Sequence, residues 1–308
     1  MGLLRAFYRY LAFPLFFFGG VWLAHELMAR GHAPGLVVSG AAIATAIAVI
    51  IGEQVLPYAA AWNRSHRDIL TDLLHSALSN GAVSAVVRPA ILGIAAWAAT
   101  TIEVPWSIWP TSWPWPLQLA LALTAAEFAH YWIHRLMHTW GPLWRLHAIH
   151  HSAPRLYWLN AGRSHPLAVT VILAFDLPAM LLLGAPPEAL AMYLVATAIH
   201  GLFQHCNIDL RLGPLNHVFS MAELHRWHHA RTGPGAFSNY GGNLIIWDTV
   251  FGTRYLPDEG IAADGLGFEG DDAYPATFLG QLAAPFQGDP NHFGERAAAA
   301  GERSPTAP

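Results

Sequence analysis

The stretch EFAHYWIHRLMHTWGPLWRLHAIHH, residues 127–151, carries six histidines at helical spacing. Residues three and four apart lie on one face of a helix, and this rule predicts that the first half presents one polar stripe. Gly141 and Pro142 break that helix, and a second helix is expected to follow, with its three histidines on one face. The first stripe consists of Glu127, His130, His134 and His138, and the second of His147, His150 and His151.

A third histidine cluster lies about seventy residues further on, in ELHRWHH, where His225, His228 and His229 repeat the HxxHH pattern. Neutral imidazole is a good ligand for iron, zinc and copper. The single cysteine, Cys206, excludes an intramolecular disulfide, a thiolate zinc finger and an iron–sulfur site. Any metal would therefore be held mainly by nitrogen. The eight histidines of HxxxH and the two HxxHH motifs are too many for one metal and suit two.

The composition is that of a membrane protein. Of the 308 residues, 54% are hydrophobic and only 12% are charged, and the mean hydropathy is positive. The formal net charge of −4 is small and predicts no nucleic-acid partner.

Successive apolar runs predict an all-α, polytopic membrane helical bundle with a histidine-rich, two-metal cap. We expect about four transmembrane helices, followed by two shorter apolar segments that form either a re-entrant hairpin or two tilted helices. The four long runs are 11–28, 35–56, 81–99 and 117–132, and the two shorter ones are 167–183 and 189–203.

The distribution of arginines predicts the orientation. Arginines flank alternate ends of the spans, with Arg30 as the one exception, whereas the Trp- and Pro-rich connector 103–116 has no Lys or Arg, as expected of a non-cytoplasmic surface. The histidine loops should therefore face the cytoplasm. This layout suits a bacterial inner membrane, and the alternative is a protein of the endoplasmic reticulum. We expect three regions: a transmembrane part (1–116), a catalytic part (117–256) and a polar C-terminal tail (257–308) that ends in a disordered segment.

Two other classes of protein fit a histidine-rich membrane chain. A metal transporter would place ligands and carboxylates near the middle of its spans, but here the clusters follow the spans. A zinc-dependent membrane hydrolase would need a glutamate base as in HExxH, and neither HExxH nor GxSxG is present. The position of the clusters after the spans and the absence of these hydrolase motifs favour a two-metal oxidase over both.

The motifs EFAHYWIHRLMH, HAIHHS, RSHP, FQHCNI, ELHRWHH and FSNYGGNLIIWDTVFGTRY resemble the successive signatures of the fatty acid hydroxylase/sterol desaturase superfamily of membrane oxidases. The resemblance covers about residues 117–256. It implies two iron ions, with zinc possible in purified protein, and dioxygen as co-substrate. Electrons would come from an external donor, a ferredoxin or a cytochrome b5-like protein with its reductase. The reaction would be hydroxylation or desaturation of a lipid, which could be a fatty acyl chain, a sterol-like lipid, an ether lipid or a carotenoid.

The resemblance also assigns roles to residues. His205 is expected as a ninth ligand, and His165 either as a ligand or as a hydrogen-bond partner of one. Glu127 and His130 would orient ligand imidazoles, and Asn239 and Asp248 would either hydrogen-bond a ligand or form a turn. No catalytic side chain is expected beyond the metal ligands. The eight ligands implied by the histidine motifs are His134, His138, His147, His150, His151, His225, His228 and His229.

Overall fold

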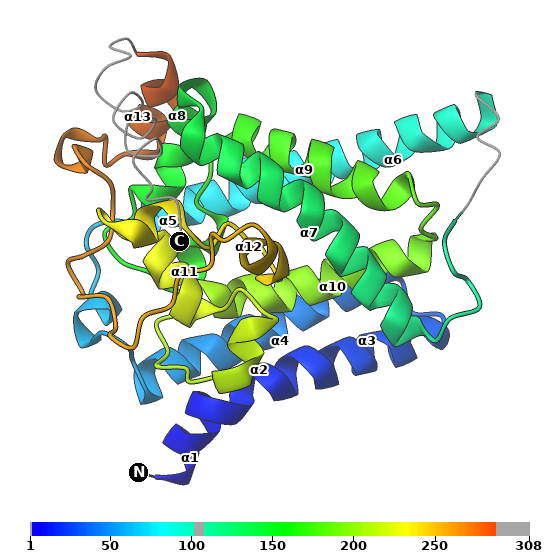
Figure 1. The fold of residues 1–308 in the computed structure, drawn as a ribbon, viewed down its shortest axis with the longest axis horizontal. Helices are drawn as coiled ribbons and strands as arrows, with labels where there is room; N and C mark the ends of the chain where they lie inside the picture. Colours follow the sequence, from blue (N-terminus) through cyan, green and yellow to red (C-terminus); the bar gives the residue numbers. More distant parts are fainter. Residues whose placement is uncertain (1, 102–107, 288–308) are drawn as a thin grey trace.

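The computed structural model describes residues 2–101 and 108–287 and consists of helices joined by turns and loops (Figure 1). Within these residues no β-strand forms. Extended backbone pairing is limited there to three isolated β-bridges. The prediction of an all-α membrane bundle is confirmed. Part of the Trp- and Pro-rich connector (102–107) and the end of the C-terminal tail (288–308) lie outside the described residues.

Three helical stretches in the described part are long and apolar enough to cross a membrane: Leu3–Ala29, Pro34–Val55 and Ile69–Ile94. The first joins α1 (Leu3–Ala6), α2 (Ala12–Pro14) and α3 (Gly20–Ala29) through two π-helical segments, and the second is α4 (Pro34–Val55). The third joins α5 (Ile69–Leu74) to α6 (Val83–Thr101) through the π-helical segment η4 (His75–Ala82). Large apolar side chains such as Ile43 and Ile47 point outward on α4, as lipid contact requires.

The third stretch begins about twelve residues before the predicted run 81–99. Hydropathy did not predict this part of the helix, because it contains the polar residues Asp72, His75 and Ser79. In the structure all three are fully buried against protein. Their polarity therefore faces the protein interior and leaves the outer surface apolar.

The predicted fourth span is α7 (Trp115–Thr139), which is long but is not among the three stretches that meet the criteria of length and hydropathy. Its polar stripe, which includes Glu127 and His134, lowers the mean hydropathy. The two shorter apolar segments are separate helices, α9 (Pro166–Leu181) and α10 (Pro187–Gln204). α9 packs on α6 and α7, whereas α10 packs on α4, α3 and α7, and α7 lies between them (Figure 1).

The short elements gather at one end of this bundle (Figure 1). They include α8 (Gly141–His151), α11 (Ala222–His228), α12 (Ile246–Val250), α13 (Phe278–Ala283) and the 3-10 helix η5 (Trp158–Gly162). Residues 257–287, expected in the polar tail, fold back onto this end, where Ile261, Leu266 and Phe268 are buried. The remaining 3-10 helices are Ala60–Asn63, Gly213–His217, Pro234–Phe237, Asp271–Ala273 and Ala284–Phe286.

Candidate metal centre

Nine buried or nearly buried histidines form two neighbouring groups at the end of the bundle. Within each group the ligand nitrogens all lie within 4.8 Å of one another. We call them the five-histidine group, composed of His134, His138, His147, His151 and His228, and the four-histidine group, composed of His150, His205, His225 and His229.

Each HxxHH motif contributes to both groups. On α8, His147 and His151 are one turn apart and join the five-histidine group, while His150 points to the other group. On α11 the division is reversed. His225 and His229 join the four-histidine group, and His228 joins the five-histidine group. The two groups consequently touch, and the His151 and His229 rings stack with centroids 4.3 Å apart.

The distances between ring nitrogens suit metal ligands. In the five-histidine group the Nε2 atom of His147 lies 3.0 Å from Nε2 of His134 and 3.1 Å from Nε2 of His151. In the four-histidine group Nε2 of His225 lies 2.9 Å from Nε2 of His205 and 3.0 Å from Nε2 of His229. Two nitrogens at right angles on one ion, each ~2.1 Å from it, would be ~3.0 Å apart.

Hydrogen bonds alone do not account for this arrangement. A neutral imidazole carries one proton, and Nδ1 of His134 lies 2.6 Å from the carbonyl oxygen of Tyr240, to which it donates that proton. The Nε2 atom of His134 is then a bare acceptor facing His147. The buried Nε2 atoms of His138 and His228 have no hydrogen-bond partner among the described residues. Bound cations would satisfy all these nitrogens, so the residues fit a metal centre.

Burial keeps these side chains uncharged. It lowers the pKa of His150 to about 4 and lowers the pKa values of His147, His151, His225 and His228 well below the usual 6.5, with neighbouring histidines adding to most of these shifts. A metal ligand must be the neutral imidazole. The site therefore presents histidines that are already in the binding form at neutral pH.

The loop that follows α11 supports the five-histidine group. The Nδ1 atom of His134 donates to the carbonyl of Tyr240, and Nδ1 of His228 donates to the carbonyl of Ser238 at 2.8 Å. Such hydrogen bonds fix the tautomer, leaving Nε2 free to bind metal.

Three residues that we expected near the ligands hold this loop instead of touching a ligand directly. Both Glu127 oxygens accept from the loop, one from the backbone N–H of Gly242 and the other from that of Asn243. Asp248 accepts from the N–H groups of Tyr240 and Gly241, each at 2.8 Å. Asn239 forms a turn with a positive φ of 55°, and its side chain bonds the backbone of Leu224 and Tyr255.

The segment 155–163 supports the four-histidine group, and the sequence had not singled it out. The carbonyl of Arg163 accepts from Nδ1 of His150 at 3.0 Å, and Nδ1 of His205 donates to Oδ1 of Asn160 at 3.2 Å. The only signal in the sequence was that this segment follows the HAIHHS motif and ends on Arg163, the first residue of RSHP.

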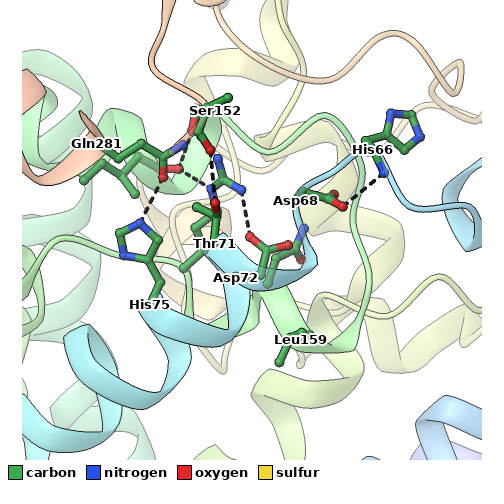
Figure 2. Close-up of polar contacts among 12 residues, drawn as sticks. His66, Asp68, Thr71, Asp72, His75, Ser152, Leu159 and Gln281 are labelled. Atoms are coloured by element: carbon green, nitrogen blue, oxygen red, sulfur yellow. Dashed lines mark hydrogen bonds and ion pairs between the residues drawn. The ribbon is translucent and has the colours of Figure 1, made fainter. Parts of the chain in front are cut away.

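Acidic residues from the N-terminal region hold that segment in place. Asp72 pairs with the buried Arg163 at 2.7 Å and accepts from the hydroxyl of Tyr157 at 2.8 Å. Asp68 forms a two-point ion pair with the buried Arg155 at 2.7 and 2.9 Å. Figure 2 shows Asp68, Asp72 and His75 on the same face of the helical stretch that begins with α5, with Gln281 of α13 bonded to His75.

The structure does not bring three other histidines into either group. His165 precedes α9, where its Nδ1 accepts from the N–H of Leu167, and its Nε2 lies 3.4 Å from the carbonyl of Leu282. His130 pairs through Nδ1 with Asp176 at 3.2 Å. His200 is fully buried against the rings of Phe13 and Phe219.

Comparisons with known proteins agree with this geometry. Residues 119–253 match the family model described as fatty acid hydroxylase. The chain is 36% identical over 247 residues to the ornithine lipid hydroxylase OlsE of Rhizobium tropici, covering 79% of this chain and 74% of that protein. It is 32% identical to human alkylglycerol monooxygenase over 50% of this chain and 33% of the human protein, and 26% identical to rat methylsterol monooxygenase 1 over 45% of this chain and 48% of the rat protein. No solved structure matches.

The fold and the paired histidine groups define a membrane-bound lipid oxidase with a metal-binding site. The chain belongs to the fatty acid hydroxylase/sterol desaturase superfamily, as the resemblance predicted. It is an oxidoreductase that acts on a lipid with dioxygen as co-substrate.

Proposed function

We propose that this protein is a di-iron monooxygenase that hydroxylates an amino-acid-containing membrane lipid of the ornithine-lipid type. The observation that carries the proposal is the pair of buried groups, with five and four histidines, in contact with each other. The substrate class is supported by the ornithine lipid hydroxylase, which is similar to this chain over most of both lengths. We favour hydroxylation over desaturation because the relatives reported above are named hydroxylases or monooxygenases.

We propose that each histidine group holds one iron ion, mainly through Nε2 atoms. The bound iron would supply the activation of dioxygen and the oxidation of a C–H bond. The chain itself would fix the ligand tautomers through Tyr240, Ser238, Arg163 and Asn160, and would keep the ligands neutral by burial. Since no other side chain is assigned to the chemistry, the protein's contribution is binding, orientation and exclusion of water.

Three further features belong to the same proposal. Electrons come from a separate protein, a ferredoxin or a cytochrome b5-like donor with its reductase. The metal centre faces the cytoplasm at a bacterial inner membrane, in line with the positive-inside distribution of arginines. The catalytic region, residues 117–256, functions only together with the transmembrane region, residues 1–116, because Asp68 and Asp72 hold the segment that supports the four-histidine group.

The test is metal content together with product formation. Protein expressed with added iron and purified in detergent should contain about two metal ions per chain, measured by elemental analysis with zinc counted alongside. With ornithine lipid, dioxygen and a reductant, mass spectrometry should detect a product heavier by one oxygen atom. His150→Ala should lower metal content and abolish the product, while the exposed His217→Ala should change neither. Full metal content in His150→Ala would contradict the ligand assignment.

A further inference from the structure

A small cavity lies directly beside the metal centre. Its volume is about 240 Å³, and histidines of both groups form one wall. The other walls come from η4, α6, α7, α9 and α10, and from the loop at Gly241–Asn243. Besides the metal-centre histidines, the polar lining residues that matter here are Asn80, Ser84, Arg88, His130, Asp176 and Tyr193.

Arg88 is the cation of this cavity. It lies on α6 within the apolar stretch Ile69–Ile94, where a charged side chain is costly and usually marks a functional site. Its Nε is buried without a hydrogen-bond partner, and its guanidinium forms no ion pair among the described residues. A guanidinium can bind a carboxylate through two parallel hydrogen bonds, so Arg88 offers a site for an anionic group.

Asp176 is the anion. It is only 6% exposed on α9, and its Oδ2 atom pairs with His130 at 3.2 Å, while its Oδ1 is buried without a partner among the described residues. Such an unpaired carboxylate oxygen is costly to bury unless a donor is supplied. An ammonium group of a ligand would be that donor.

Tyr193 of α10 lines the same cavity as Arg88 and Asp176. One cavity therefore presents an anion-binding and a cation-binding group next to the histidines. We propose that Arg88 and Asp176 determine substrate specificity by binding the carboxylate and the ammonium of a zwitterionic amino-acid lipid head group. This inference rests on the proposed function and names the residues that recognise its substrate.

The size of the cavity fits a head group better than a long acyl chain. Cavities that enclose drug-sized ligands measure ~300–1,000 Å³, and this cavity is smaller, at about 240 Å³. An ornithine acylated on its α-nitrogen keeps one carboxylate and one side-chain ammonium, which match the Arg88 guanidinium and the free Oδ1 atom of Asp176. Phosphatidylethanolamine is also a zwitterion, but its anionic group is a phosphate.

The experiment pairs changes in the protein with changes in the lipid. Dissociation constants would be measured for the metal-loaded protein in lipid nanodiscs, with ornithine lipid, its carboxylate methyl ester, its N-acetylated side-chain derivative and phosphatidylethanolamine. Wild type should bind ornithine lipid about 10- to 100-fold more tightly than either derivative, because each derivative removes the ligand group that would bond either the Arg88 guanidinium or Oδ1 of Asp176. Arg88→Gln should remove the preference over the methyl ester only, and Asp176→Asn the preference over the N-acetyl derivative only.

Matched controls are Arg30→Gln and Asp264→Asn, which alter exposed residues outside the cavity. Arg88→Lys keeps the charge and should retain most of the preference, and it serves as the test if Arg88→Gln does not fold. Equal weakening of all lipids by a variant, or an unchanged preference, would overturn the proposal. Equally tight, Arg88-dependent binding of phosphatidylethanolamine would overturn the assignment to a carboxylate.

Turnover assays on the same samples separate this inference from the proposed function. Selective binding that depends on Arg88 and Asp176, without oxidation of the lipid, would support the recognition site and contradict the proposed reaction. Oxidation of ornithine lipid by variants whose lipid preference is unchanged would support the proposed reaction and contradict the recognition site. A wild-type protein that neither binds nor oxidises the lipid would overturn both.

Discussion

The five-histidine and four-histidine groups share α8 and α11, yet different parts of the chain support them. The five-histidine group is oriented by backbone carbonyls of the loop after α11, which Glu127 and Asp248 hold in place. The four-histidine group is oriented by the segment 155–163, which ion pairs fasten to Asp68 and Asp72 in the N-terminal region.

The difference shows that one half of the centre depends on residues inside the recognisable family region, while the other half also depends on residues outside it. The family match covers residues 119–253 and includes both supporting segments, but neither Asp68 nor Asp72. The two groups should therefore respond differently to mutations in the two halves of the chain.

The largest effect should come from removing one ligand from each group. His228→Ala should empty the five-histidine group and His225→Ala the four-histidine group, so that each variant loses about one of two metal ions. Oxidation should fall by more than ~100-fold in both, since loss of a ligand's hydrogen-bond partner alone costs ~10–100-fold. Elemental analysis and product assays check this, with His217→Ala as the control. Loss of both metals in either variant would mean that the groups are not independent.

A smaller but still large effect is expected for Asp72→Asn. The substitution leaves the buried guanidinium of Arg163 without its charged partner, which costs about 3–5 kcal/mol of stability. Metal should be lost first from the four-histidine group. Thermal unfolding and metal content measure the two effects, and the exposed Asp264→Asn is the matched control. A preferential loss of metal from the five-histidine group would contradict the conclusion that Asp72 supports the four-histidine group.

Asp248→Ala should produce the opposite pattern. The backbone N–H groups of Tyr240 and Gly241 would lose their acceptor, at a cost of about 1–3 kcal/mol for each unsatisfied group. Because the Tyr240 carbonyl orients His134, a competing chelator should remove metal from the five-histidine group at a lower concentration than in wild type. An unchanged chelator profile would show that the loop keeps its position without Asp248.

The smallest effect is expected for Asn160→Ala. This substitution removes the hydrogen-bond acceptor of His205 Nδ1 and the contacts of the Asn160 side chain within the local turn. Metal affinity of the four-histidine group should fall about tenfold. Asn160→Asp keeps an acceptor oxygen and should restore most of it. If both variants bound metal equally weakly, the role of Asn160 would be in the turn and not in orienting His205.

Much of the site could be predicted from local sequence. The spacing of HxxxH and HxxHH places imidazoles on one helical face regardless of what surrounds them, and nine of the ten histidines proposed as ligands lie in the two groups. His165 is the tenth, and RSHP by itself could not show that its ring would cap α9 and reach toward Leu282. The start of the third apolar helix was missed because Asp72, His75 and Ser79 look hydrophilic until their burial is known.

The sequence by itself determined the class of this protein: an α-helical membrane oxidase whose metal centre is made of histidines. That information is local, because helical periodicity and apolar run length act over a few turns of chain. Only the tertiary structure decided how each HxxHH divides between two groups, which residues orient the ligands, and that Arg88 and Asp176 line one cavity beside them. These include contacts between residues more than a hundred positions apart, such as His134 with Tyr240. Sequence spacing does not predict such contacts, because the packing of whole helices brings these residues together.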